Sequence, residues 1–259
     1  MGGQIRRGRT NLFLSLLRAE ATVLRDFAMN RPRPGAKRLV YQGLIALVRP
    51  VTLWLKWESQ GLSGSHFVAV NRTELLENAV KRGCQAEAKF GPGLWLEFGV
   101  YRGETLHEIA AMAPTTVYGF DSFEGLPDYW GPGHPRGTFA VRGQFMPMPK
   151  NVELVPGLFE KTVPAFLGIR AEQHATFVHV DCDLYSSART VLRYLQGFLR
   201  EGSVMVFDEF CGLVPDDEAR AFREFLRESG CSFHYLGVSY HGSVLIEIGP
   251  SRANFHSGD

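Results

Sequence analysis

The chain has 259 residues, 45% of them hydrophobic and 21% charged, so it can bury one large core and needs no division into several domains. Its four cysteines form no Cys-x-x-Cys pair and no framework spacing, which argues against a disulfide scaffold and favours a reduced, cytoplasmic environment. The net charge of +1 hides an asymmetry, because residues 1–60 hold eleven Lys or Arg against three Asp or Glu, which leaves 17 against 24 in the remainder.

The first part of the chain, residues 1–60, is expected to form a basic helical extension or cap ahead of a catalytic domain over residues 61–259. Leucines interspersed with charged residues over 12–25 predict an amphipathic helix, and a second helical stretch follows over 38–57. We expect no transmembrane helix and no cleavable targeting peptide. The extension is expected to pack against the acidic body of its own or a neighbouring subunit, in a possible homo-oligomer, and peripheral contact with a membrane surface is the less favoured alternative.

From residue 94 onward, short apolar runs alternate with helical segments, which predicts an α/β fold with a mostly parallel sheet. Strands are expected over 94–98, 116–120, 152–155, 176–180, 203–207, 233–238 and 243–248, and helices over 104–113, 159–167, 186–199 and 217–229. The last two strands have no helix between them and should form an antiparallel hairpin turned by His241 and Gly242. Seven strands ending in such a hairpin resemble the Rossmann-like fold of class I methyltransferases. The irregular segment 124–150, with five prolines and five glycines, is expected to be a lid or binding loop.

The turn after the first of these strands predicts a cofactor site. Its glycines, Gly99 and Gly103, let a ligand approach the backbone closely, but they stand four apart and do not make the Gly-x-Gly-x-x-Gly fingerprint of a dinucleotide cofactor. Glu97 would repel a pyrophosphate and attract the ammonium group of a methionine moiety. The alternative for this segment is an ordinary tight turn with an exposed glutamate.

The ends of the second and third strands add two further cofactor contacts. Asp121, followed by Ser122, can accept hydrogen bonds from both ribose hydroxyls, and the turn at Gly157 could flank an adenine ring. Together these segments indicate S-adenosylmethionine as the cofactor. The expected cofactor-binding residues are Glu97, Gly99, Tyr101, Gly103, Thr105, Asp121, Ser122, Gly157, Phe159 and Asp181.

Carboxylates follow two strands that we expect to be neighbours in the sheet. Asp181 and Asp183 stand two apart after one strand, so they would face the same side if the extended backbone continued, and Asp208 and Glu209 follow the next. Converging carboxylates repel one another, and a hard divalent cation resolves that repulsion. An oxygen-only ligand set favours Mg²⁺, with other divalent ions as alternatives. Helix or loop capping is the structural alternative for Asp183 and Asp208, and His179, inside its strand, is expected to be a core histidine.

Four segments resemble the macrocin-type O-methyltransferases, which methylate sugar hydroxyls in antibiotics: residues 97–103, 121–127, 157–164 and 181–187. The resemblance covers about residues 94–248 and implies that Asp181, Asp208 and Glu209 hold Mg²⁺, with Glu209 standing where the family usually has a second aspartate. It also implies that Asp183 is the catalytic general base.

The sequence therefore predicts an S-adenosylmethionine-dependent, Mg²⁺-assisted O-methyltransferase that acts on a hydroxyl of a sugar or related small-molecule acceptor, without a nucleic-acid partner. Two other functions remain as alternatives. One is a metal-dependent hydrolase on the same kind of sheet, and the other is a non-catalytic module that binds membrane surfaces through the basic extension.

Overall fold

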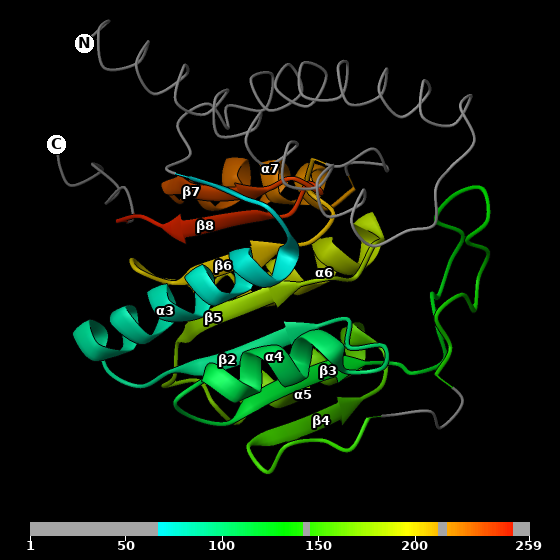
Figure 1. Cartoon of the computed structure of the whole chain (residues 1–259), viewed down its shortest axis with the longest axis horizontal. Coiled ribbons are helices and arrows are strands. Elements are labelled where there is room, and N and C mark those ends of the chain that lie inside the picture. Colours follow the sequence, from blue (N-terminus) through cyan, green and yellow to red (C-terminus); the bar gives the residue numbers. More distant parts are fainter. Residues whose placement is uncertain (1–66, 142–145, 212–216, 251–259) are drawn as a thin grey trace, which may run out of the picture.

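A computed structural model describes residues 67–141, 146–211 and 217–250 of the chain (Figure 1). The helices expected over 12–25 and 38–57 and the domain boundary expected near residue 60 lie outside the described residues. Among the described helices, none combines the length and apolar character that a membrane span requires.

The described residues form one sheet with strand order β1-β7-β8-β6-β5-β2-β3-β4. Its strands are β1 (Phe67–Ala69), β2 (Leu94–Phe98), β3 (Val117–Asp121), β4 (Val152–Pro156), β5 (Ala175–Val180), β6 (Val204–Phe207), β7 (Phe233–Ser239) and β8 (Val244–Ile248). All neighbouring pairs are parallel except β6 with β8 and β7 with β8, which are antiparallel. The predicted Rossmann-like fold with its C-terminal hairpin is thus confirmed. The predicted number of seven strands was wrong by one, because the short strand β1 adds to the sheet beside β7.

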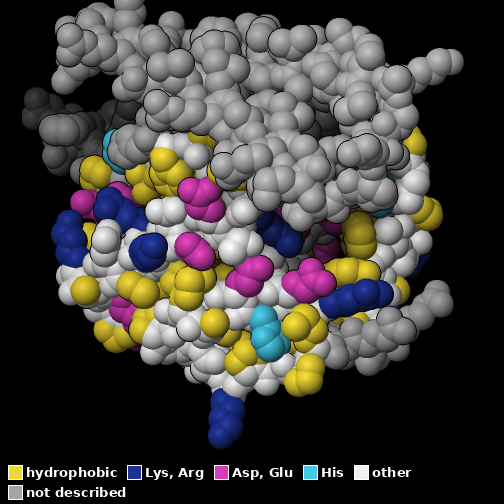
Figure 2. Space-filling view, viewed as in Figure 1, with side chains coloured by type: hydrophobic (Ala, Val, Ile, Leu, Met, Phe, Trp, Pro, Cys, Tyr) yellow, Lys and Arg dark blue, Asp and Glu magenta, His cyan; other side chains and the backbone are white. Residues whose placement is uncertain are grey.

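Helices cover both faces of the sheet (Figure 1). They are α3 (Arg72–Phe90), α4 (Glu104–Met112), α5 (Phe159–Gly168), α6 (Tyr185–Leu195) and α7 (Asp217–Ser229). The α3–α4 pair packs on one face, and α5, α6 and α7 pack on the other, so the sheet separates two hydrophobic clusters. On the described surface of the α3–α4 side, acidic and basic side chains are interspersed (Figure 2).

The helix α3 was not predicted, although the sequence contains the signals that start and stop it. Asn71 caps its first turn by accepting a hydrogen bond from the Glu74 N–H at 2.9 Å, and Gly91, with φ 88°, ends it. One face of α3 is buried against the sheet, and it includes Leu75, Leu76 and Ala79. The first turn of α3 lies at the same edge of the sheet as the acidic strand ends described below.

The strand order places a switch point at the centre of the sheet. From β2 the chain proceeds to β3 and then β4 on one side, whereas β5 and then β6 lie on the other. In open α/β sheets, ligands bind beyond the carboxyl ends of the strands at such a point. The loops after β2 and β5 flank this position.

Candidate active site

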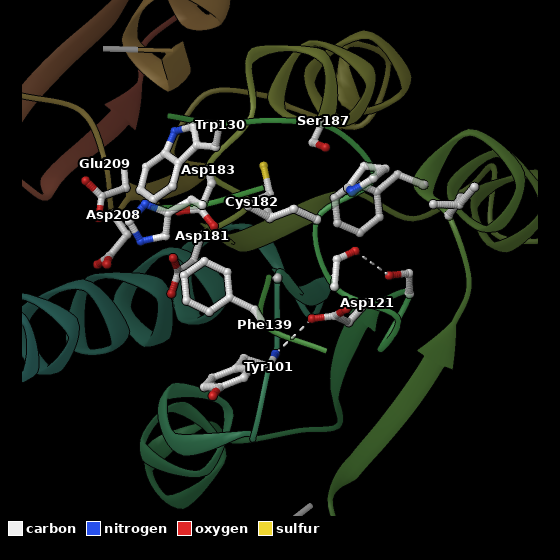
Figure 3. A pocket seen from close by; sticks show the side chains of 18 of the residues that line it. Tyr101, Asp121, Trp130, Phe139, Asp181, Cys182, Asp183, Ser187, Asp208 and Glu209 are labelled. Atoms are coloured by element: carbon white, nitrogen blue, oxygen red, sulfur yellow. Dashed lines mark hydrogen bonds between the residues drawn. The ribbon is translucent and has the colours of Figure 1, made fainter. Parts of the chain in front are cut away.

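A cavity of about 430 Å³ lies over the carboxyl ends of the central strands. It has the size of an ordinary small-molecule site. The predicted site residues that line it are Gly99, Tyr101, Asp121, Ser122, Gly157, Phe159, Asp181, Asp183, Asp208 and Glu209. Figure 3 shows Tyr101 and Asp121 toward one end of this cavity and Asp181, Asp208 and Glu209 toward the other. Glu97, Gly103 and Thr105, which were also predicted to contact the cofactor, do not line it.

The turn after β2 is pressed against the end of β5. Gly99 has φ 93°, and a Cβ atom at this position would lie only 1.7 Å from the carbonyl oxygen of Asp181. The Asp181 N–H also donates a hydrogen bond to the carbonyl oxygen of Phe98 at 2.8 Å. Glycine is therefore required at position 99 for both its dihedral angles and its lack of a side chain.

Asp121, at the end of β3, holds the same turn from the other side. Its Oδ2 accepts hydrogen bonds from the N–H groups of Val100 and Tyr101, both at 2.8 Å, and its Oδ1 accepts one from the Phe123 N–H at 2.7 Å. A carboxylate has about four acceptor positions, so these bonds leave some capacity for a ligand. Asp121 both fixes the turn and presents acceptor oxygen to the cavity.

Glu97 is fully buried within β2, below the cavity. Its Oε1 accepts a hydrogen bond from the Thr105 hydroxyl and lies 3.1 Å from Nδ1 of His179, which is also fully buried. Glu97 and Thr105, two of the predicted cofactor contacts, therefore bind each other. Gly103 caps the amino end of α4 with φ 91°.

The four predicted carboxylates lie together at the other end of the cavity (Figure 3). Asp183 has φ 61°, so the extended backbone of β5 does not continue through it, although both Asp181 and Asp183 line the cavity. Burial, together with the charges of Glu209 and Asp208, raises the pKa of Asp183 to about 7. Burial and Asp208 likewise raise the pKa of Glu209 to about 7, and the pKa of Asp181 lies well above its ordinary value for the same reasons.

Two residues that sequence reasoning missed hold this acidic end together. Arg72, in the first turn of α3, places Nη1 3.2 Å from Asp208 Oδ2 and 3.4 Å from Asp181 Oδ2. Glu218, fully buried in α7, accepts hydrogen bonds from the N–H groups of Cys182 at 3.1 Å and Glu209 at 3.0 Å. No local motif marks Arg72 in the sequence.

Glu218 did leave a signal in the sequence. It stands four residues before Phe222 and seven before Phe225, and both phenylalanines are buried. A carboxylate therefore falls on the apolar stripe of a helix, where an isolated charge is costly unless it has a specific partner.

Three of the described residues could hold a divalent cation. Ligand atoms of His179, Asp181 and Asp208 lie within 4.8 Å of one another. His179 Nε2 is buried and has no hydrogen-bond partner within the described part of the chain, and it lies 4.0 Å from Asp208 Oδ1. Two carboxylates and an unpaired imidazole nitrogen thus converge, and Arg72 supplies positive charge beside them.

Aromatic side chains from the described part of the segment 124–150 line the cavity. The rings of Trp130 and His134 are 4.9 Å apart, and the ring of Phe139 lies 5.5 Å from that of Tyr101. All four line the cavity. The described residues of this segment thus form one wall of the cavity, which agrees with the predicted binding loop.

Residues 96–210 match the family model Methyltransf_24, described as a methyltransferase domain. No curated protein sequence matches the chain. The chain is similar in structure to CalS11, a calicheamicin methyltransferase, with 21% sequence identity and a TM-score of 0.54 over 88% of this chain and 91% of that one.

Two further solved structures are similar at lower scores. The O-methyltransferase NovP is 20% identical with a TM-score of 0.49, over 68% of this chain and 79% of that one. An O-methyltransferase from Bacillus cereus in complex with SAH is 14% identical with a TM-score of 0.41, over 76% and 89%.

The strand order and the position of the cavity define a Rossmann-like fold of the methyltransferase type. The family match over residues 96–210 then supports the assignment of the chain as a methyltransferase. The match runs from within β2 to just beyond β6, so it includes most of the residues that line the cavity.

Proposed function

We propose that the protein is an S-adenosylmethionine-dependent O-methyltransferase that acts on a hydroxyl of a sugar or a related small natural-product acceptor, with the assistance of a divalent cation. One observation carries the proposal. A single cavity joins a glycine turn held by Asp121 to a group of carboxylates that includes Asp183.

The cofactor would lie along the turn after β2 and the ends of β3 and β4. Gly99 and Tyr101 offer a closely approachable backbone, and Asp121 and Ser122 offer oxygen atoms to ribose hydroxyls. Phe159 supplies apolar surface for the adenine. S-adenosylmethionine would supply the methyl group from its sulfonium centre.

The divalent cation would be held by carboxylates of the acidic end, Asp181, Asp208 and Glu209, which offer oxygen ligands to a hard cation. When bound there, the cation would make a neighbouring acceptor hydroxyl more acidic. In the cation's absence, Arg72 offsets part of the negative charge by contacting Asp181 and Asp208.

Asp183 would accept the proton of the acceptor hydroxyl. In the metal-free protein, burial and the neighbouring carboxylates raise its pKa to about 7, so Asp183 binds a proton more readily than an exposed aspartate does. Trp130 and Phe139 line the same cavity, and their rings would help to exclude water and to hold the acceptor in position. Positioning and electrostatics would supply most of the rate acceleration.

Calorimetry with S-adenosylhomocysteine, followed by transfer of a labelled methyl group to a panel of glycosides and polyols, tests the proposal. We expect saturable binding of S-adenosylhomocysteine and methyl transfer that is lost with a chelator and restored by a divalent cation. A metal-dependent hydrolase would bind no S-adenosylhomocysteine, and that result would overturn the proposal. Binding without transfer to any hydroxyl acceptor would refute its acceptor class.

A further inference from the structure

His179 occupies an unusual position for a core histidine. It sits in β5 beneath the acidic end of the cavity and is fully buried. Its Nδ1 faces Glu97 Oε1 at 3.1 Å, whereas Nε2 points toward the carboxylates and has no hydrogen-bond partner among the described residues. Buried polar atoms without a partner are rare in folded proteins, so this nitrogen calls for an explanation.

The hydrogen bond to Glu97 determines what Nε2 can do. Because a carboxylate only accepts hydrogen bonds, Nδ1 must carry a proton, and a neutral imidazole then presents a lone pair at Nε2. That lone pair faces the nearby oxygens of Asp208 and Asp181. The carboxylate oxygens cannot donate a hydrogen bond to that lone pair, but a cation between the three groups would be bound by all of them.

We propose that His179 Nε2 is a ligand of the divalent cation, together with Asp181 and Asp208, and that this nitrogen makes the site select a transition-metal ion over Mg²⁺. The inference rests on the cation site of the proposed function. Imidazole suits ions such as Co²⁺, Ni²⁺ and Zn²⁺, while Mg²⁺ strongly prefers oxygen ligands. Mn²⁺ accepts both ligand types and serves as a spectroscopic probe.

This assignment also gives the buried carboxylate of Glu97 a role through its Oε1 atom. Histidine ligands commonly donate their second N–H to a carboxylate, which fixes the tautomer and the orientation of the ring. Glu97 stands in this position, and the Thr105 hydroxyl bonds to the same Oε1. Glu97 is thus a positioning residue for His179.

A rival explanation is that His179 is protonated on both nitrogens and pairs with Asp208. The present separation of 4.0 Å between Nε2 and Asp208 Oδ1 is too long for a hydrogen bond. Asp208 Oδ1 instead accepts a hydrogen bond from the Ser243 hydroxyl at 3.0 Å, and Asp208 Oδ2 faces Arg72 at 3.2 Å. Direct detection of a metal–nitrogen bond separates the two explanations.

The decisive experiment is pulsed EPR on the full chain loaded with Mn²⁺, prepared with ordinary histidine and again with ¹⁵N-labelled histidine. We expect a ¹⁴N coupling of a directly bound imidazole that is replaced by a ¹⁵N signal on labelling. Bound Mn²⁺ without histidine coupling, or no Mn²⁺ binding at all, would overturn the inference. The wild-type protein alone gives this answer, whether or not a variant folds.

Two substitutions identify the histidine. In His179→Gln the nitrogen coupling should disappear. In His134→Gln it should remain, because His134 lines the same cavity but is not one of the three residues whose ligand atoms converge. The ratio of Co²⁺ to Mg²⁺ affinity, measured by competition, should fall by about tenfold or more in His179→Gln. An unchanged ratio would contradict the proposal. None of these measurements uses methyl transfer, so a failed metal assignment is distinguishable from a failed enzyme assignment.

Discussion

The two ends of the cavity contain similar side chains in opposite surroundings. At the cofactor end, Asp121 accepts hydrogen bonds from three backbone N–H groups and holds the turn after β2. At the acidic end, burial and like charges raise the pKa of Asp183, and His179 Nε2 has no hydrogen-bond partner among the described residues. The carboxylate at the cofactor end is thus held by backbone donors, whereas the carboxylates at the acidic end are buried beside one another.

This difference implies that the two ends can be disrupted separately. A substitution at the acidic end should change chemistry or cation binding and leave cofactor affinity intact. A substitution at the cofactor end should lower cofactor affinity and leave cation binding intact. A substitution at the seam, the contact between Gly99 and Asp181 where the two ends meet, should impair both ends.

The largest effect is expected for Asp183→Asn, which keeps the shape of the side chain and removes its ability to take up a proton. Methyl transfer should fall by about 10³-fold, because general-base catalysis contributes about 10²–10⁴-fold. Initial rates with labelled S-adenosylmethionine measure the loss. Binding of S-adenosylhomocysteine should stay within about twofold, and unchanged turnover would refute the role of Asp183.

The seam between the two ends is tested by Gly99→Ala. The new Cβ would meet the Asp181 carbonyl oxygen at 1.7 Å and would force alanine into a left-handed backbone, at a cost of about 3 kcal/mol or more of unfolding free energy. Urea denaturation measures the change in unfolding free energy. Gly168→Ala is the matched control, since a Cβ at Gly168 contacts no atom within 4 Å, and equal stability of the two variants would contradict the close packing of the turn.

Asp121→Asn should act at the cofactor end alone. The amide group replaces one acceptor oxygen by a donor facing backbone N–H groups, so the affinity for S-adenosylhomocysteine should fall by about tenfold, equivalent to about 1.4 kcal/mol. Calorimetry measures the affinity, and Mn²⁺ affinity should be unchanged. Asp128→Asn, an exposed aspartate in the following loop, is the control. A parallel loss of Mn²⁺ binding in Asp121→Asn would break the separation of the two ends.

The same comparison explains what could be predicted from the sequence. Local apolar runs in the sequence predict the central strands. Because parallel strands bring their carboxyl ends to one edge of the sheet, Asp121, Asp181 and Asp208 could be placed together from sequence alone. Arg72 could not, because it meets Asp208 across 136 residues and its helix was not expected.

Glu97 shows a second limit of the sequence. Its position near a strand end suggested a contact with the cofactor, but the direction of its side chain depends on Thr105 and on His179, which lies on another strand. Only the packed structure determines that pairing.

The smallest effect concerns the pH dependence of stability in the metal-free protein. The folded-state pKa values of Asp183 and Glu209, both about 7, lie above their ordinary values of 3.8 and 4.5. The folded state therefore binds more protons than the unfolded state between about pH 4 and 7, and the unfolding free energy should fall as pH rises through this window. We expect these two groups to contribute about 1 kcal/mol to that fall, less than their full shifts imply because the cavity admits water.

Chemical denaturation with a chelator at several pH values measures the slope of unfolding free energy against pH. The slope should be shallower in the double variant Asp183→Asn/Glu209→Gln and should decrease when a divalent cation is added. Equal slopes with and without the two carboxylates would mean that the acidic end is already balanced, as the cofactor end is.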